Sequence, residues 1–210
     1  EAFSTILKDE PSLADARFNL GLTYLRLRCP QDAVREFTDL LVQHPGLAEA
    51  FYQRGNGNDD LGYTDQALSD YSRAIELVPD YVHAMYNRGI LLAQAARHQE
   101  AVAQFDKVIA IQPDISNCYL NQGASLDELG LHSEAIRAYT MATELNPENS
   151  FALFNRARTN YYLGNLHDAL ADYSQVIELT PDDAEAFNNR GLTYDALKDY
   201  KDAVHDFDTA

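Results

Sequence analysis

The sequence predicts an all-α protein built from successive helical hairpins, because several residue types recur along it at one fixed spacing. Six of the seven prolines lie 34 residues apart, and alanines and aromatic residues follow the same spacing. A domain with a single core has no reason to repeat residue types so regularly, whereas stacked supersecondary units do. The prolines that keep the spacing are Pro11, Pro45, Pro79, Pro113, Pro147 and Pro181.

Small and aromatic residues at this spacing indicate where the two helices of each unit meet. Glycine within a helix costs about 1 kcal/mol relative to alanine, so a close helix contact must compensate for it. We expect the repeated glycine and alanine to face each other, with the aromatic ring filling the space beside them. The glycine column is Gly21, Gly55, Gly89, Gly123, Ala157 and Gly191. The alanine column is Ala33, Ala67, Ala101, Ala135, Ala169 and Ala203. The aromatic column is Phe37, Tyr71, Phe105, Tyr139, Tyr173 and Phe207.

Other residues predict where the helices end. The repeated proline cannot continue a helix, and the aspartates that follow it are candidate caps for the next helix. These are Asp80, Asp114 and Asp182. Gly62, Gly130 and Gly164 are expected to end the first helix of their units in a left-handed turn. The segment 28–30 replaces that glycine turn in the first unit, so we expect a different turn there.

The glycine, alanine, aromatic and proline columns resemble those of the tetratricopeptide repeat family, whose unit is a pair of antiparallel helices. The resemblance implies a right-handed α-solenoid superhelix, with Ala14 as position 1 of the first repeat. The expected repeats are 14–47, 48–81, 82–115, 116–149, 150–183 and a truncated 184–210, preceded at 1–13 by the half helix and loop that end another repeat. Because both ends fall within a repeat, we expect an excerpt from a longer array.

Composition argues against several functions. The formal net charge of −17 disfavours nucleic acids, which need a basic surface. Apolar runs are too short to cross a membrane. No catalytic motif or metal-ligand spacing is present, so we expect no enzymatic activity, no cofactor and no metal. The two cysteines show no disulfide pattern, and we expect an intracellular, cytoplasmic protein.

Charged residues at two positions of the repeat predict internal ion pairs. Position 7 is arginine in four repeats, and three of those have aspartate sixteen residues later. We expect each arginine to reach across its hairpin to that carboxylate, in a structural role. The expected pairs are Arg54 with Asp70, Arg156 with Asp172 and Arg190 with Asp206, while Arg88 faces Gln104.

The resemblance also places a binding surface on the first helix of each repeat, at positions 2, 5, 6, 9, 12 and 13. Position 6 carries an amide in every repeat, and an amide can hold a peptide group through both a donor and an acceptor. This column is Asn19, Gln53, Asn87, Asn121, Asn155 and Asn189. It is similar to the asparagine ladder in the helical arm of the intracellular N-acetylglucosamine transferase. Alternatively, these amides bond within the array.

Aromatic and acidic residues complete the candidate site. Tyr52, Tyr86 and Phe154 at position 5 are candidate anchors for partner side chains, or they pack between neighbouring first helices. Asp59, Asp127 and Asp195 at position 12 would make part of the groove acidic. Together these residues predict a protein or peptide partner, extended and basic or amphipathic.

These features predict a protein–protein interaction scaffold that binds its partner on the concave face. The alternative is a substrate-recruiting arm of a larger enzyme such as a glycosyltransferase. Self-association through the exposed ends is a further possibility. The polar segment 56–60 in the second repeat has low helix propensity, and we expect weakened packing there.

Overall fold

The computed structural model describes residues 14–210, which form helices joined by short connections and contain no strand. The expected all-α class is therefore confirmed for this part of the chain, and the half helix expected at 1–13 lies outside the described residues. The helices are α2 (Ala14–Arg26), α3 (Pro30–Gln43), α4 (Ala48–Asp60), α5 (Thr64–Leu77), α6 (Val82–Gln94), α7 (His98–Ile111), α8 (Ser116–Glu128), α9 (His132–Leu145), α10 (Ser150–Tyr162), α11 (Leu166–Leu179), α12 (Ala184–Ala196) and α13 (Tyr200–Thr209).

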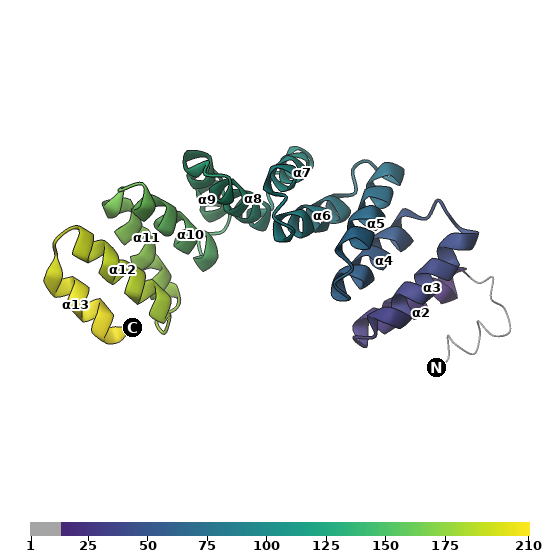
Figure 1. Ribbon diagram of the computed structural model, residues 1–210, viewed down its shortest axis with the longest axis horizontal. Coiled ribbons are helices and arrows are strands. Elements are labelled where there is room, and N and C mark those ends of the chain that lie inside the picture. The colour runs from purple at the N-terminus through teal and green to yellow at the C-terminus, as the bar shows by residue number, and fades with distance from the viewer. Residues whose placement is uncertain (1–13) are drawn as a thin grey trace. The chain divides into compact units, whose positions relative to one another are not determined.

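The helices pack in chain order within two compact units, one ending at Gln104 and the other beginning at Phe105. In the first unit, α2 pairs with α3 and α4 with α5, while α3 also contacts α4 and α5 contacts α6. In the second unit, α8 pairs with α9, α10 with α11 and α12 with α13, and α9 and α11 each contact the helix that follows (Figure 1). The second helices α3, α5, α9 and α11 are thus each shared between two hairpins, which is how such arrays bury a continuous core.

The repeated small and aromatic residues form that core. Every alanine of the column is at most 2% exposed, and five of the six aromatic residues are at most 1% exposed. At Gly123 the nearest neighbour across the hairpin is the aromatic residue and not the expected alanine, and an added Cβ would lie 2.6 Å from a ring carbon of Tyr139. A methyl group does not fit at that distance, so the Tyr139 ring packs this closely against α8 because residue 123 is glycine.

The turn inside each hairpin uses a left-handed residue, as expected for Gly62, Gly130 and Gly164, whose φ angles are 74°, 74° and 81°. The prediction of a different turn in the first repeat is wrong, because Arg28 adopts φ 58° at the equivalent position. Cys29 N–H then donates to the Tyr24 carbonyl at 2.9 Å, the bond that every other hairpin makes. Pro30 begins α3, where a helix needs no N–H.

The predicted helix caps are wrong by one residue. The N-caps of α6, α8 and α12 are Tyr81, Ile115 and Asp183, and each directly follows the aspartate that the sequence suggested. The reason is a tight turn after the second helix, shown by the bond from Tyr81 N–H to the Val78 carbonyl at 3.1 Å. This turn delays the start of the next helix by one residue. Asp183 does accept a hydrogen bond from Ala186 N–H at 3.0 Å.

The predicted ion pairs are confirmed. Arg54, Arg156 and Arg190 each hold the expected aspartate through two hydrogen bonds, with nitrogen–oxygen distances between 2.6 and 2.9 Å. The aspartate side chains are only 1–9% exposed. Arg88 donates to Gln104 Oε1 at 2.7 Å instead. Such a pair is costly to break from one side, because the remaining group keeps its charge away from water.

Polar contacts hold residues 56–60, where the sequence predicts weakened packing, and that expectation stays a prediction. The helix α4 continues through this segment to Asp60. Asn58 is buried and donates to Asp70 at 2.9 Å, and Asn56 accepts from the Tyr71 hydroxyl at 2.9 Å. Gly57 lies so close to Val34 that an added Cβ would stand 2.9 Å from it. Hydrogen bonds and a close contact thus replace the apolar packing usual at these positions.

In the described part of the chain, each helix is too short or too polar to cross a lipid bilayer.

Candidate functional site

The amide column of the first unit is largely engaged within the array. Asn87 donates from Nδ2 to Asn56 Oδ1 at 3.0 Å and lies 3.3 Å from the Tyr52 hydroxyl. Gln53 donates to Glu49 on its own helix at 2.9 Å and accepts from Asn56 at 3.1 Å. For Gln53 and Asn87, the alternative of bonding within the array therefore describes the structure.

In the second unit, some amides of the column have partners within the chain, and one makes no side-chain hydrogen bond within the described part of the chain. Asn189 donates to the backbone carbonyl of Glu185 at 2.9 Å, and Asn121 also has a partner within the chain. Asn155 is half-buried on α10, and its backbone carbonyl accepts from the Thr159 hydroxyl at 2.9 Å. In the first unit Asn19 is exposed on α2. Asn19 and Asn155 are thus the amides best placed to meet a partner.

The aromatic residues at position 5 are half-buried on the first helices. The Phe154 ring meets Tyr173 edge-on, with 5.6 Å between ring centroids. Tyr52 lies 6.1 Å from Tyr71 and 5.1 Å from Tyr81 by the same measure. Tyr86 is half-buried. The rings of Tyr52 and Phe154 thus pack against neighbouring aromatic residues, and a role for this column as anchors for partner side chains stays a prediction.

The three acidic residues at position 12 differ in what they offer to a ligand. Asp195 is exposed. Asp59 is exposed as well, and its pKa is raised by partial burial and by the neighbouring charge of Asp60. Asp127 is half-buried and already occupied. It accepts from the Tyr139 hydroxyl at 3.0 Å and from the Thr159 hydroxyl at 2.6 Å.

His132 completes this cluster around Asp127. Its Nδ1 lies 3.0 Å from Asp127 Oδ1, and its ring centroid lies 4.9 Å from that of Tyr162. Burial and the Asp127 charge raise the pKa of Tyr139 well above its ordinary value, so its hydroxyl remains a donor. The cluster lines a pocket of about 290 Å³ that also includes Glu128 and Arg158. Asp127 therefore lines a pocket and already has partners within the chain, and its role toward a ligand stays a prediction.

Comparison with known proteins identifies the repeat. Tetratricopeptide repeat models match residues 52–114 and 116–149, and a TPR repeat model matches residues 157–198. The chain contains tetratricopeptide repeats.

Solved structures of tetratricopeptide repeat proteins share the fold. MamA from Desulfovibrio magneticus RS-1 is 22% identical, with a TM-score of 0.77 over 81% of this chain and 96% of that one. PilW, described as a type IV pilus biogenesis factor, is 22% identical, with a TM-score of 0.76 over 93% and 90%. YrrB, described as a TPR protein with an unusual peptide-binding site, is 25% identical, with a TM-score of 0.73 over 82% and 89%. No curated protein matches the chain by sequence.

The sequence pattern did not single out one exposed face of α10. Four residues of α10 recur at helical spacing and so share one face of the helix: Phe151, Asn155, Arg158 and Tyr162. Phe151 is 73% exposed and Tyr162 is 74% exposed, and Arg158 is also exposed. We call these four residues the α10 stripe. Phe151 and Tyr162 stand at positions 2 and 13, which the family pattern already placed on the binding surface, so the signal was present.

Proposed function

We propose that the array binds an extended segment of another protein along the surface of its first helices, and that the α10 stripe is the centre of that contact in the second unit. The observation that carries this proposal is the exposure of Phe151 and Tyr162. Each leaves about three quarters of its side chain in water, although burying an aromatic side chain normally contributes about 1.5–3 kcal/mol. Exposed aromatic rings beside an arginine are the residue types that dominate protein interfaces.

The stripe also suggests how a peptide would bind. The two rings lie three helical turns apart, about 16 Å along the helix, with Asn155 and Arg158 between them. The rings would contact apolar side chains of the peptide, while the amide and the guanidinium would bond its backbone. Asn19 would offer a similar amide contact in the first unit.

Exposed acidic residues favour a peptide that is also basic. Glu128 lies beside Arg158 in the pocket described above, and Asp195 is exposed on α12. The net charge of −17 would increase the rate of encounter with a cationic partner. We therefore propose an amphipathic peptide with apolar and basic residues. The hypothesis of a substrate-recruiting enzyme arm involves this same surface, and self-association stays a prediction.

Selection from a peptide display library on the immobilised array tests this function. The affinity of a selected peptide is then measured for Phe151→Ala, Tyr162→Ala and Asn155→Ala variants. The matched control is Tyr200→Ala, which removes an aromatic side chain that is 60% exposed on the second helix α13. We expect Phe151→Ala and Tyr162→Ala each to weaken the affinity for the peptide at least tenfold. The control variant should bind the peptide with the affinity of the parent. Peptides that bind all four variants equally, or a library that yields no binder, would refute the proposal.

A further inference from the structure

Two pockets occupy the same place in two different repeats, one in each unit. The first, of about 350 Å³, is lined by Val34, Thr38, Arg54, Asn58, Tyr63, Gln66, Ser69 and Asp70. The second, of about 480 Å³, is lined by Ile136, Thr140, Arg156, Asn160, Asn165, Asp168, Ala171 and Asp172. Each residue of the second pocket lies 102 residues, or three repeats, after its counterpart in the first. Both pockets are bounded by two successive second helices and by the first helix between them. For the second pocket that first helix is α10, which contributes Arg156 and Asn160 and none of the four stripe residues.

An asparagine at position 11 explains why the pockets occur in these repeats. Asn58 and Asn160 stand where the other repeats carry a large side chain, namely Tyr24, Leu92, Leu126 and Tyr194. Both asparagines are buried, 6% and 5% exposed, and both line their pockets. The shorter side chain leaves open the space that leucine or tyrosine fills elsewhere and places an amide at its base.

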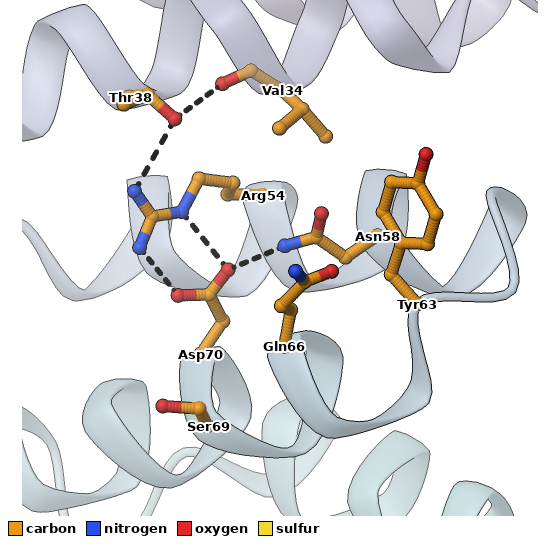
Figure 2. Close-up of a pocket in the computed structure, with 8 residues that line it drawn as sticks. All are labelled: Val34, Thr38, Arg54, Asn58, Tyr63, Gln66, Ser69 and Asp70. Atoms are coloured by element: carbon orange, nitrogen blue, oxygen red, sulfur yellow. Dashed lines mark hydrogen bonds and ion pairs between the residues drawn. The ribbon is translucent and has the colours of Figure 1, made fainter.

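The first pocket is electrically balanced. Its one cation, Arg54, binds both oxygens of Asp70, and Asn58 donates to the same carboxylate (Figure 2). Arg54 also donates to the Thr38 hydroxyl at 3.3 Å. Gln66 contributes a neutral amide to the wall. The charges of this pocket therefore cancel, and it has no strong preference for a charged ligand.

The second pocket differs by one negative charge. Arg156 and Asp172 neutralise each other through two bonds of 2.8 Å. The third nitrogen of Arg156, Nη1, donates to the Thr140 and Thr143 hydroxyls at 3.1 and 3.0 Å. The guanidinium is thus almost saturated with acceptors.

The additional charge comes from Asp168, which replaces Gln66 of the first pocket and lines this one. The hydrogen bonds that Arg156 donates to Asp172, helped by the field of Asp168, hold the pKa of Arg156 above its ordinary value. Asn165 donates from Nδ2 to Asn160 Oδ1 at 3.1 Å, which leaves the Asn165 oxygen as a further acceptor on the rim. A carboxylate and an amide oxygen beside a saturated ion pair match a ligand that donates hydrogen bonds and carries positive charge.

We propose that the pocket between α9 and α11 binds a cationic side chain, lysine or arginine, of a partner protein, with Asp168 as its counter-charge and Asn160 at its base. The proposal concerns a different surface from the α10 stripe and does not depend on the function proposed above. It also makes the pocket at Asn58 the neutral counterpart within the same chain.

A purely structural role for Asp168 is the competing explanation. Asp168 lies in the first turn of α11, where a carboxylate stabilises the helix dipole. Asp202 has the same place in α13, but Tyr194 occupies position 11 of that repeat. Asp202→Asn therefore removes the same charge from the same helical position in a repeat that has a tyrosine in place of Asn160, and serves as the matched control for Asp168→Asn.

The test is a titration followed by ¹⁵N nuclear magnetic resonance, with Nα-acetyl-lysine N-methylamide as the probe at low ionic strength. The norleucine analogue, which lacks the ammonium group, is the neutral control probe. We expect saturable shifts of the Asn160 and Asn165 side-chain amide signals by the lysine probe, with a Kd of about 1 mM, as befits one small group. The Asn58 signals and the norleucine titration should show no saturable shift.

Variants decide between a site and general attraction to an acidic surface. We expect Asp168→Asn to weaken binding at least fivefold and Asp202→Asn to leave it unchanged. Asn160→Leu should abolish binding, because it copies the residue that fills this space at Leu126. Three results would each overturn the proposal. The two aspartate variants could weaken binding equally, the shifts could grow linearly over the whole acidic surface, or the Asn160 and Asn165 signals could show no shift. If Asn160→Leu does not fold, the comparison of the two aspartate variants still decides.

Discussion

The ion pair between Arg156 and Asp172 gives the sharpest prediction about stability. The substitution Arg156→Gln removes the guanidinium and leaves a carboxylate whose side chain is only 9% exposed. Breaking one side of a buried pair typically costs about 3–5 kcal/mol. Because Arg156 itself is 19% exposed, solvent can reach part of the site, and we expect a smaller loss of about 2–3 kcal/mol.

The chain itself supplies the control for this prediction. Repeat 4 has Gln122 and Ala138 at the two positions that carry Arg156 and Asp172 in repeat 5. The double variant with Arg156→Gln and Asp172→Ala therefore copies a combination that already folds in this protein. With no charge left buried, we expect its free energy of unfolding to lie within about 1 kcal/mol of the parent.

Urea unfolding followed by circular dichroism measures both variants against the parent chain. A double variant more stable than the single one would show that the stranded carboxylate, and not the loss of contacts, causes the damage. If Arg156→Gln unfolds at the same urea concentration as the parent, or if the double variant is the less stable of the two, the reasoning is refuted.

Three further predictions concern the turns, the thiols and a surface carboxylate. Ala96→Gly should raise the free energy of unfolding by about 1 kcal/mol, because Ala96 has a φ of 57° that glycine adopts without strain; an unchanged urea midpoint would contradict this. Burial raises the pKa of the Cys118 thiol to about 12, so a disulfide reagent at pH 8 should modify Cys29 in the folded protein and Cys118 only after unfolding; equal rates for both thiols would be inconsistent with the structure. The raised pKa of Asp59 means that its charged form opposes folding. Asp59→Asn should therefore raise the melting temperature at pH 7, and this gain should vanish as the pH falls below about 4, the ordinary pKa of an aspartate; a gain that persists in acid would have another cause.

The repeat fold could be predicted because each marker residue acts within one hairpin. The glycine at position 8, the alanine at position 20 and the aromatic at position 24 contact one another wherever two helices of this length are joined by a short turn. Arg156 and Asp172 could be paired for the same reason. Their positions face each other inside one hairpin, so the spacing of sixteen residues was sufficient.

The hydrogen-bond partners of Asn87 and Asp127 could not be predicted in the same way, because they include side chains of the neighbouring repeat. Asn87 is engaged by Asn56, and Asp127 by Thr159, across 31 and 32 residues respectively. Asn56 stands at position 9 of its repeat and Thr159 at position 10, and the residue type at each of these positions varies among the repeats. The 34-residue spacing therefore does not predict these hydrogen bonds.

The helix caps and the first turn were missed for a different reason. A backbone turn precedes Tyr81 and sets where α6 begins, whatever polar residue comes before it. Arg28 adopts the left-handed conformation because the hairpin needs it, at a cost of about 1 kcal/mol that packing offsets. In both cases tertiary structure prevails over local residue preference.

Contact between the α10 stripe and a bound peptide can be measured directly by photo-crosslinking. Benzoylphenylalanine is incorporated in place of Phe151, or in place of Tyr200 as the control, and each protein is irradiated with a peptide selected on the parent array. Our account predicts a covalent adduct with the peptide from position 151 and none from position 200. Crosslinking from position 200 alone, or from neither site under conditions where the peptide is bound, would show that the partner is held elsewhere.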